Sequence, residues 1–94
     1  MPKIAIYQAL IFYIVSFDLS ERLHVHVFSK QKGRNRSAKI WLDDFSIFEK
    51  GQLTEKELST AQKLVEQNKD KISNLIEDFR SGKKVKPLQL TLTK

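Results

Sequence analysis

The sequence contains no cysteine among its 94 residues. That absence excludes disulfide frameworks, thiolate zinc sites, iron–sulfur clusters and cysteine nucleophiles. Glycine is scarce too, because Gly33, Gly51 and Gly82 are its only glycines and stand alone. Phosphate-binding loops need a glycine-rich turn before a helix, so the sequence predicts no nucleotide-binding loop. It also lacks the Gly-x-Ser-x-Gly motif that would indicate a serine hydrolase.

Long hydrophobic runs are missing as well. The longest apolar stretch, residues 4–17, follows Lys3 and is interrupted by Gln8. It is shorter than the roughly 18 residues that a membrane helix needs. Its Ile, Val, Phe and Tyr residues favour strands, and no small-residue cleavage motif follows it. We therefore expect no targeting segment, no membrane association and a cytoplasmic location.

Acidic residues are outnumbered, with 11 Asp plus Glu against 17 Lys plus Arg, which gives a net charge of +6. The excess is uneven: residues 21–39 and residues 80–94 each carry +5, whereas residues 40–79 carry −4. A basic protein favours an acidic partner such as nucleic acid. If the two basic regions meet in the fold they form one phosphate-binding patch; if they do not, each is an ordinary solvated surface.

Period-two alternation predicts the strands. Residues 4–7 and 10–17 are interpreted as one bent strand or as a hairpin broken near Gln8. Residues 23–28 and 38–43 alternate cleanly, and residues 29–37 between them contain Gly33 and only polar side chains otherwise, which predicts a mobile hairpin loop. Further extended segments are expected at residues 45–48 and after Pro87.

A capping box predicts where the helical part begins, because Thr54 is followed three residues later by Glu57. An amphipathic stripe then recurs at helical spacing, at Leu58, Ala61, Leu64, Val65, Ile72, Leu75, Ile76 and Phe79. Residues 68–71 are wholly polar, which leaves one long helix or two consecutive helices ending before Gly82. The prediction is an α+β fold: a small, mostly antiparallel sheet of three to four strands packed by these C-terminal helices, in one domain over residues 1–94 with a basic tail at residues 83–94.

One strand carries two histidines on the same face. Leu23, Val25 and Val27 are predicted to face the core, so His24, His26 and Phe28 face the opposite side. Paired imidazoles suit general acid and general base roles in RNA cleavage, because imidazole titrates near neutral pH. The pair is also consistent with a metal site, given a third ligand such as Asp43 or Asp44, or with ordinary structural side chains.

The same face is predicted to hold cationic and aromatic groups. In the strand at residues 38–43, Ala38, Ile40 and Leu42 are expected on the core side, with Lys39, Trp41 and Asp43 opposite. Trp41 would stack on an unpaired base, and cations would hold phosphates; those expected are Lys30, Lys32, Arg34, Arg36 and Lys39. The alternative is that the C-terminal segment covers Phe28 and Trp41 as part of the core.

Taken in order, these residues resemble a known family. The His-Val-His-Val strand, the Ala-Lys-Ile-Trp-Leu strand at residues 38–42 and the amphipathic helices resemble the small bacterial family called domain of unknown function four-one-six-zero. The resemblance covers residues 4–90. It implies a suspected toxin of a type II toxin–antitoxin pair, encoded beside a second small protein, with no settled activity.

The leading hypothesis from the sequence is a cytoplasmic bacterial toxin-like protein that binds or acts on RNA, with ribonuclease activity as one form of that action. His24 and His26 are the candidate catalytic residues, and the cations together with Trp41 are the candidate RNA-binding residues. No cofactor is predicted, and the expected partners are RNA and a small cognate antitoxin. The alternative is a non-enzymatic protein-interaction or regulatory module, such as an antitoxin-like or partner subunit.

Overall fold

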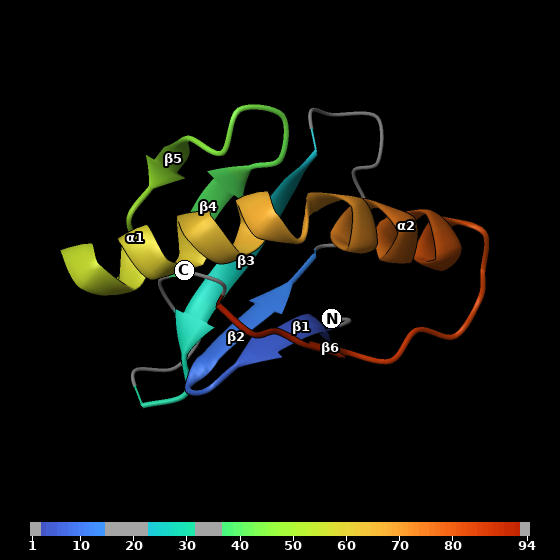
Figure 1. Cartoon of the computed structure of the whole chain (residues 1–94), viewed down its shortest axis with the longest axis horizontal. Coiled ribbons are helices and arrows are strands. Elements are labelled where there is room, and N and C mark those ends of the chain that lie inside the picture. The colour runs from blue at the N-terminus through green and yellow to red at the C-terminus, as the bar shows by residue number, and fades with distance from the viewer. Residues whose placement is uncertain (1–2, 15–22, 32–36, 93–94) are drawn as a thin grey trace.

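The computed structural model describes residues 3–14, 23–31 and 37–92. Within them the chain forms a six-stranded sheet and two helices. Figure 1 shows both helices crossing one face of this sheet. The elements are, in order, β1 (Lys3–Tyr7), β2 (Leu10–Tyr13), β3 (His24–Ser29), β4 (Ala38–Trp41), β5 (Ile47–Glu49), α1 (Glu55–Gln67), α2 (Lys69–Arg80) and β6 (Leu88–Gln89).

The spatial strand order is β5-β4-β3-β2-β1-β6. Neighbouring strands from β1 to β5 pair antiparallel, which follows from their short sequential connections. Only β6 pairs parallel, with β1, after the chain has passed through both helices. The predicted α+β class with a mostly antiparallel sheet and C-terminal helices is confirmed, and the sheet has more strands than the three to four expected.

The N-terminal apolar stretch forms a hairpin rather than one bent strand. Tyr7 pairs with Leu10 across a two-residue turn in which Gln8 has φ 51°. The predicted break near Gln8 is therefore confirmed. β2 ends at Tyr13, short of the predicted boundary at residue 17, and residues 15–22 lie outside the described part of the chain.

The core lies between the sheet and the helices. Leu58, Ala61, Leu64 and Val65 of α1 and Ile72 and Ile76 of α2 are buried. They pack in one cluster with strand residues that include Phe12, Val25, Val27 and Ile40, all fully buried. The predicted helical stripe therefore faces the sheet, and the sheet face that it covers is called the inner face.

The helical part begins as the capping box predicts. The Glu57 amide donates to the Thr54 hydroxyl at 3.1 Å, and the Thr54 amide donates to the Glu57 carboxylate at 2.8 Å. The polar gap resolves into two helices, because Asn68 caps α1 and its side-chain amide donates to the Leu64 carbonyl at 2.9 Å. Among the described residues, neither helix is long and apolar enough to span a membrane.

Candidate functional site

The site is built on the sheet face opposite the helices, here called the outer face. Directly paired residues of neighbouring strands point to the same side of a sheet. His24 pairs with Trp41, and His26 pairs with Lys39 on one side and Tyr13 on the other. The predicted alternation in β3 and β4 is thereby confirmed, because Val25 and Ile40 between these positions are fully buried on the inner face.

The two imidazoles contact each other. His24 Nε2 lies 3.2 Å from His26 Nε2, with ring centroids 4.9 Å apart and the rings tilted by 44°. An imidazole nitrogen either donates or accepts, so one Nε2 carries the proton that the other accepts. The strand geometry explains the contact, since residues two apart on a strand lie on one face.

Aromatic rings surround this pair. The Trp41 and Phe48 rings are stacked, with centroids 4.1 Å apart, and both meet the His24 ring edge-on, at 5.5 and 5.4 Å. On the other side the Tyr13 ring lies 4.9 Å from the His26 ring. Phe48 is 42% exposed, the one large hydrophobic side chain in the described part of the chain with such exposure. The outer face therefore presents an aromatic surface that reaches solvent at β5.

The environment of His26 keeps it neutral. His26 is only 9% exposed, and burial, together with the neighbouring His24 and Lys39, lowers its pKa to about 4. The Glu49 carboxylate opposes this change but does not overcome it. At pH 7 the His26 imidazole is therefore a neutral group that can accept a proton or supply a lone pair.

Among the described residues, Lys39 is the cation that acts on His26. Its Nζ lies 3.5 Å from a Glu49 carboxylate oxygen and 6.0 Å from the Phe48 ring centroid. Both partners of the ion pair are partly exposed, and such pairs contribute little stability. Lys39 can therefore exchange Glu49 for another anion at small cost.

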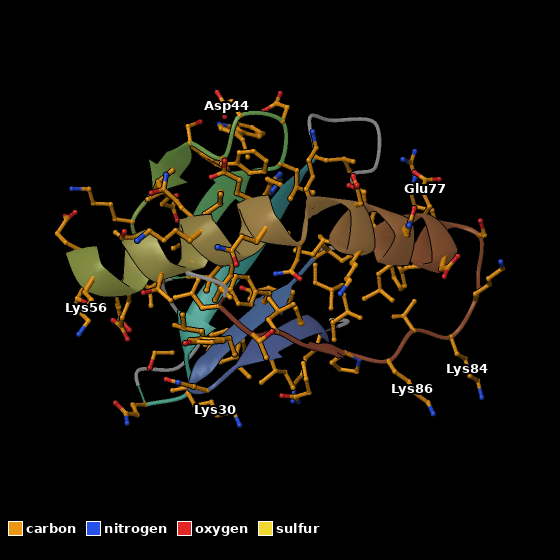
Figure 2. The ribbon with its side chains drawn as sticks, viewed as in Figure 1. Lys30, Asp44, Lys56, Glu77, Lys84 and Lys86 are labelled. Atoms are coloured by element: carbon orange, nitrogen blue, oxygen red, sulfur yellow. The ribbon has the colours of Figure 1, made fainter. Side chains whose placement is uncertain are left out.

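Of the other predicted cations, the structure describes only Lys30. Lys30 follows β3 and is exposed, whereas Lys32, Arg34 and Arg36 lie outside the described residues. In Figure 2, Lys84 and Lys86 of the C-terminal tail lie away from Lys30. The described parts of the two basic regions therefore do not form one patch.

The C-terminal segment does not cover Trp41. It joins the sheet as β6 beside β1, at the edge opposite β4 and β5. Trp41 is half-buried by its contacts with Phe48 and His24 instead. The interpretation of Trp41 as core beneath that segment is thus replaced by a position within the outer aromatic surface.

Two residues of this surface were not singled out from the sequence. Phe48 is adjacent to Trp41 only because β5 pairs with β4 across the bulge near Lys39. Tyr13 reaches His26 only through the β2–β3 register, and its hydroxyl is anchored by a hydrogen bond of 2.7 Å with the buried Ser37 hydroxyl. An alternation pattern gives the face of each residue but not its neighbour on the next strand, so no local signal identified either one.

The carboxylates proposed as a third metal ligand do not join the histidines. Asp44 accepts hydrogen bonds from the Ser46 amide and hydroxyl at 2.9 and 2.7 Å, closing the turn after β4. Among residues 3–14, 23–31 and 37–92, no group of three or more metal-binding side chains comes together. The pair of imidazoles is therefore a two-ligand arrangement.

Comparison with known proteins gives a family and nothing further. A family model described as "Domain of unknown function (DUF4160)" matches residues 10–77. The match spans β2 to α2 and includes both histidines, Trp41 and Phe48. No curated protein and no solved structure matches the chain.

Proposed function

Since the chain belongs to the DUF4160 family, whose description states no activity, we propose from its geometry that it binds single-stranded RNA over the outer face of its sheet, as a toxin-like component. One observation carries this proposal: stacked Trp41 and Phe48, two imidazoles and a lysine share one face of the sheet. Bases of single strands stack on such rings, while cations neutralise the phosphates between them.

Phe48 is the first contact for a base in this proposal. Its ring stacks on Trp41 and is partly exposed to solvent. A base that stacks there places its neighbouring phosphate near Lys39, whose weak ion pair with Glu49 is readily exchanged. Lys30, Lys32, Arg34 and Arg36 are proposed as further phosphate contacts on the strength of the sequence alone.

The histidine pair is the reactive group in the enzymatic form of the proposal. A neutral His26 would accept the proton of a ribose 2′-hydroxyl, whose oxygen attacks the adjacent phosphorus. His24 would act as the general acid and give a proton to the departing 5′ oxygen as the phosphorus–oxygen bond breaks. Because the two Nε2 atoms now contact each other, the rings must first separate to flank a phosphate, so binding is proposed as the primary function and cleavage as its extension.

RNA binding is tested with a fluorescently labelled single-stranded oligonucleotide in buffer that contains EDTA. Replacing Phe48 by Ala should weaken binding by about 1–3 kcal/mol, the range for one stacked base. Lys39→Ala should also weaken binding and reduce its salt dependence. Lys56→Ala, which removes the same charge from exposed Lys56 on α1 (Figure 2), is the matched control and should have a smaller effect.

Salt-insensitive binding, or equal affinities of wild type and Phe48→Ala, would contradict the proposal. The toxin-like role is tested by expressing wild type and the His24→Ala/His26→Ala double variant at equal levels in bacteria. Growth arrest by wild type alone supports a reactive histidine pair in the cytoplasm. It would also direct the search for a small antitoxin that covers the basic surface.

A second candidate function is a non-enzymatic interaction module. The exposed Phe48 ring on the edge strand β5 supports it, because exposed apolar groups and strand edges are both used in protein binding. In that case neither protein arrests growth, and binding of a partner protein survives the double histidine substitution.

A further inference from the structure

The two Nε2 atoms of the histidine pair lie close together on the outer face of the sheet. They are 3.2 Å apart, on side chains two residues apart in one strand. We propose that His24 and His26 together bind one divalent transition-metal ion through their Nε2 atoms, with zinc as the representative ion. This site needs no RNA and goes beyond the function proposed above.

The separation of the nitrogens suits such an ion. With zinc–nitrogen bonds of about 2.0–2.1 Å, a nitrogen separation of 3.2 Å corresponds to a nitrogen–zinc–nitrogen angle of about 100°. A tetrahedral centre requires about 109°, so this separation is close to the one that a shared ion needs, and the rings would turn until both lone pairs point to it. The ion would replace the proton that now lies between the two nitrogens.

The surrounding rings hold the imidazoles in this orientation. Trp41 and Phe48 contact the His24 ring edge-on. Tyr13 packs against His26 and is itself fixed by its hydrogen bond with Ser37. Ligands that are held in place before the ion arrives lose less freedom when it binds, which favours binding.

The proposed site is open, because the described residues provide no third ligand. Water molecules or phosphate oxygens would fill the two remaining positions of a tetrahedral ion, one more than the single open position of a catalytic zinc site with three protein ligands. Imidazole ligands select zinc, nickel or copper ions over magnesium and calcium, which prefer oxygen. Lys39 repels a bound cation and its partner Glu49 attracts it, so the ion pair leaves the local charge nearly balanced.

The composition of the chain makes zinc binding easy to assign to particular residues. The chain contains two histidines and no cysteine, so imidazole-dependent binding has no other place to occur. Zinc is titrated into untagged, metal-free protein by calorimetry in the absence of RNA, and magnesium is titrated in parallel. We expect one zinc per chain, no magnesium binding at the same concentrations, and shifts of both Nε2 resonances in nitrogen-15 NMR of the wild-type protein.

Variants then assign the ligands. His24→Gln and His26→Gln should each lower zinc affinity by at least about tenfold, the lower end of what even outer-shell changes cost. Asp44→Asn removes an exposed carboxylate of the neighbouring turn and should leave the affinity unchanged. Circular dichroism verifies that each variant is folded.

Two outcomes would overturn the site: zinc binding that both glutamine variants retain, or wild-type Nε2 resonances that zinc does not move. The NMR result does not depend on any variant folding. Zinc binding is measured without RNA, and RNA binding is measured in EDTA. The two experiments are therefore independent, and a negative result in one does not change the conclusion from the other.

Discussion

The two faces of this sheet use the same strands for different purposes. On the inner face Phe12, Val27 and Ile40 are fully buried beneath the helices. On the outer face the alternating neighbours are Tyr13, the histidines, Lys39 and Trp41, and Phe48 reaches solvent. The inner face is mainly aliphatic, with Phe12 and Tyr7 as its aromatic residues, whereas the outer face combines rings, charge and titratable nitrogen.

The difference shows that one face of the sheet forms the hydrophobic core and the other carries the candidate functional groups. A chain of this length forms one hydrophobic core, and the helices supply its second layer on the inner side only. On the outer face Tyr13 and His26 are buried, whereas Phe48 is 42% exposed, so polar and aromatic groups there lie between buried sheet and solvent. The outer-face side chains provide imidazole lone pairs and aromatic ring surfaces, which are the groups used in the proposed binding.

The largest expected contrast between the faces is in stability. Phe12→Ala should lower the free energy of unfolding by about 3–5 kcal/mol, because it leaves a cavity in the inner core. Phe48→Ala should lower it by less than about 1 kcal/mol, since that ring is partly exposed. Urea denaturation followed by circular dichroism measures both values.

Phe12→Leu is the matched control and should cost less than the alanine variant, because it refills most of the space. Equal decreases in the free energy of unfolding for Phe12→Ala and Phe48→Ala would contradict the expected difference between the two faces. They would mean that the outer aromatic surface acts as a second core.

A smaller change in the free energy of unfolding is expected when the pH is lowered. The folded protein holds the pKa of His26 at about 4, below its ordinary value of 6.5. Between pH 6.5 and about 4, His26 is protonated in the unfolded chain but neutral in the folded protein. The free energy of unfolding therefore decreases as the pH falls through this window. The contribution of His26 is at most about 1.4 kcal/mol per pH unit.

Urea denaturation of wild type and His26→Gln across that pH window isolates this contribution. The glutamine variant should show a flatter dependence on pH, because it lacks the group that titrates. Parallel curves for the two proteins would show that His26 is not held neutral by the fold.

The smallest change in the free energy of unfolding is expected when the Lys39–Glu49 ion pair on the outer face is removed. Breaking it with Lys39→Met or Glu49→Gln should cost less than about 1 kcal/mol, because both partners are partly exposed. The two variants should move the His26 pKa in opposite directions: Lys39→Met raises it and Glu49→Gln lowers it. NMR titration of the His26 ring measures the pKa, and shifts of the same sign would contradict the assignment of these charges.

Much of the fold was predictable because it depends on local patterns. The period-two alternation of residues 23–28 and 38–43 placed His24, His26, Lys39 and Trp41 on one face. The Thr54–Glu57 capping box and the helical stripe fixed where the helical part starts and which side it buries. These signals lie within a few residues of one another, so no knowledge of the rest of the chain was needed.

The site was only partly predictable because it depends on pairing between strands. Tyr13 and Phe48 meet the histidines through the registers of β2 with β3 and β4 with β5, set by packing over the whole sheet. The break between α1 and α2 at Asn68 was equally ambiguous, since its polar residues are compatible with one helix or two.

The sequence by itself therefore determined the two faces, the start of the helical part and the α+β class, because side-chain periodicity and capping are properties of neighbouring residues. Only the tertiary structure decided that the two Nε2 atoms contact each other, that Trp41 stacks on Phe48, and that β6 joins the far edge of the sheet. Those outcomes depend on strand register and ring orientation. The sum of packing contacts made by distant segments sets both.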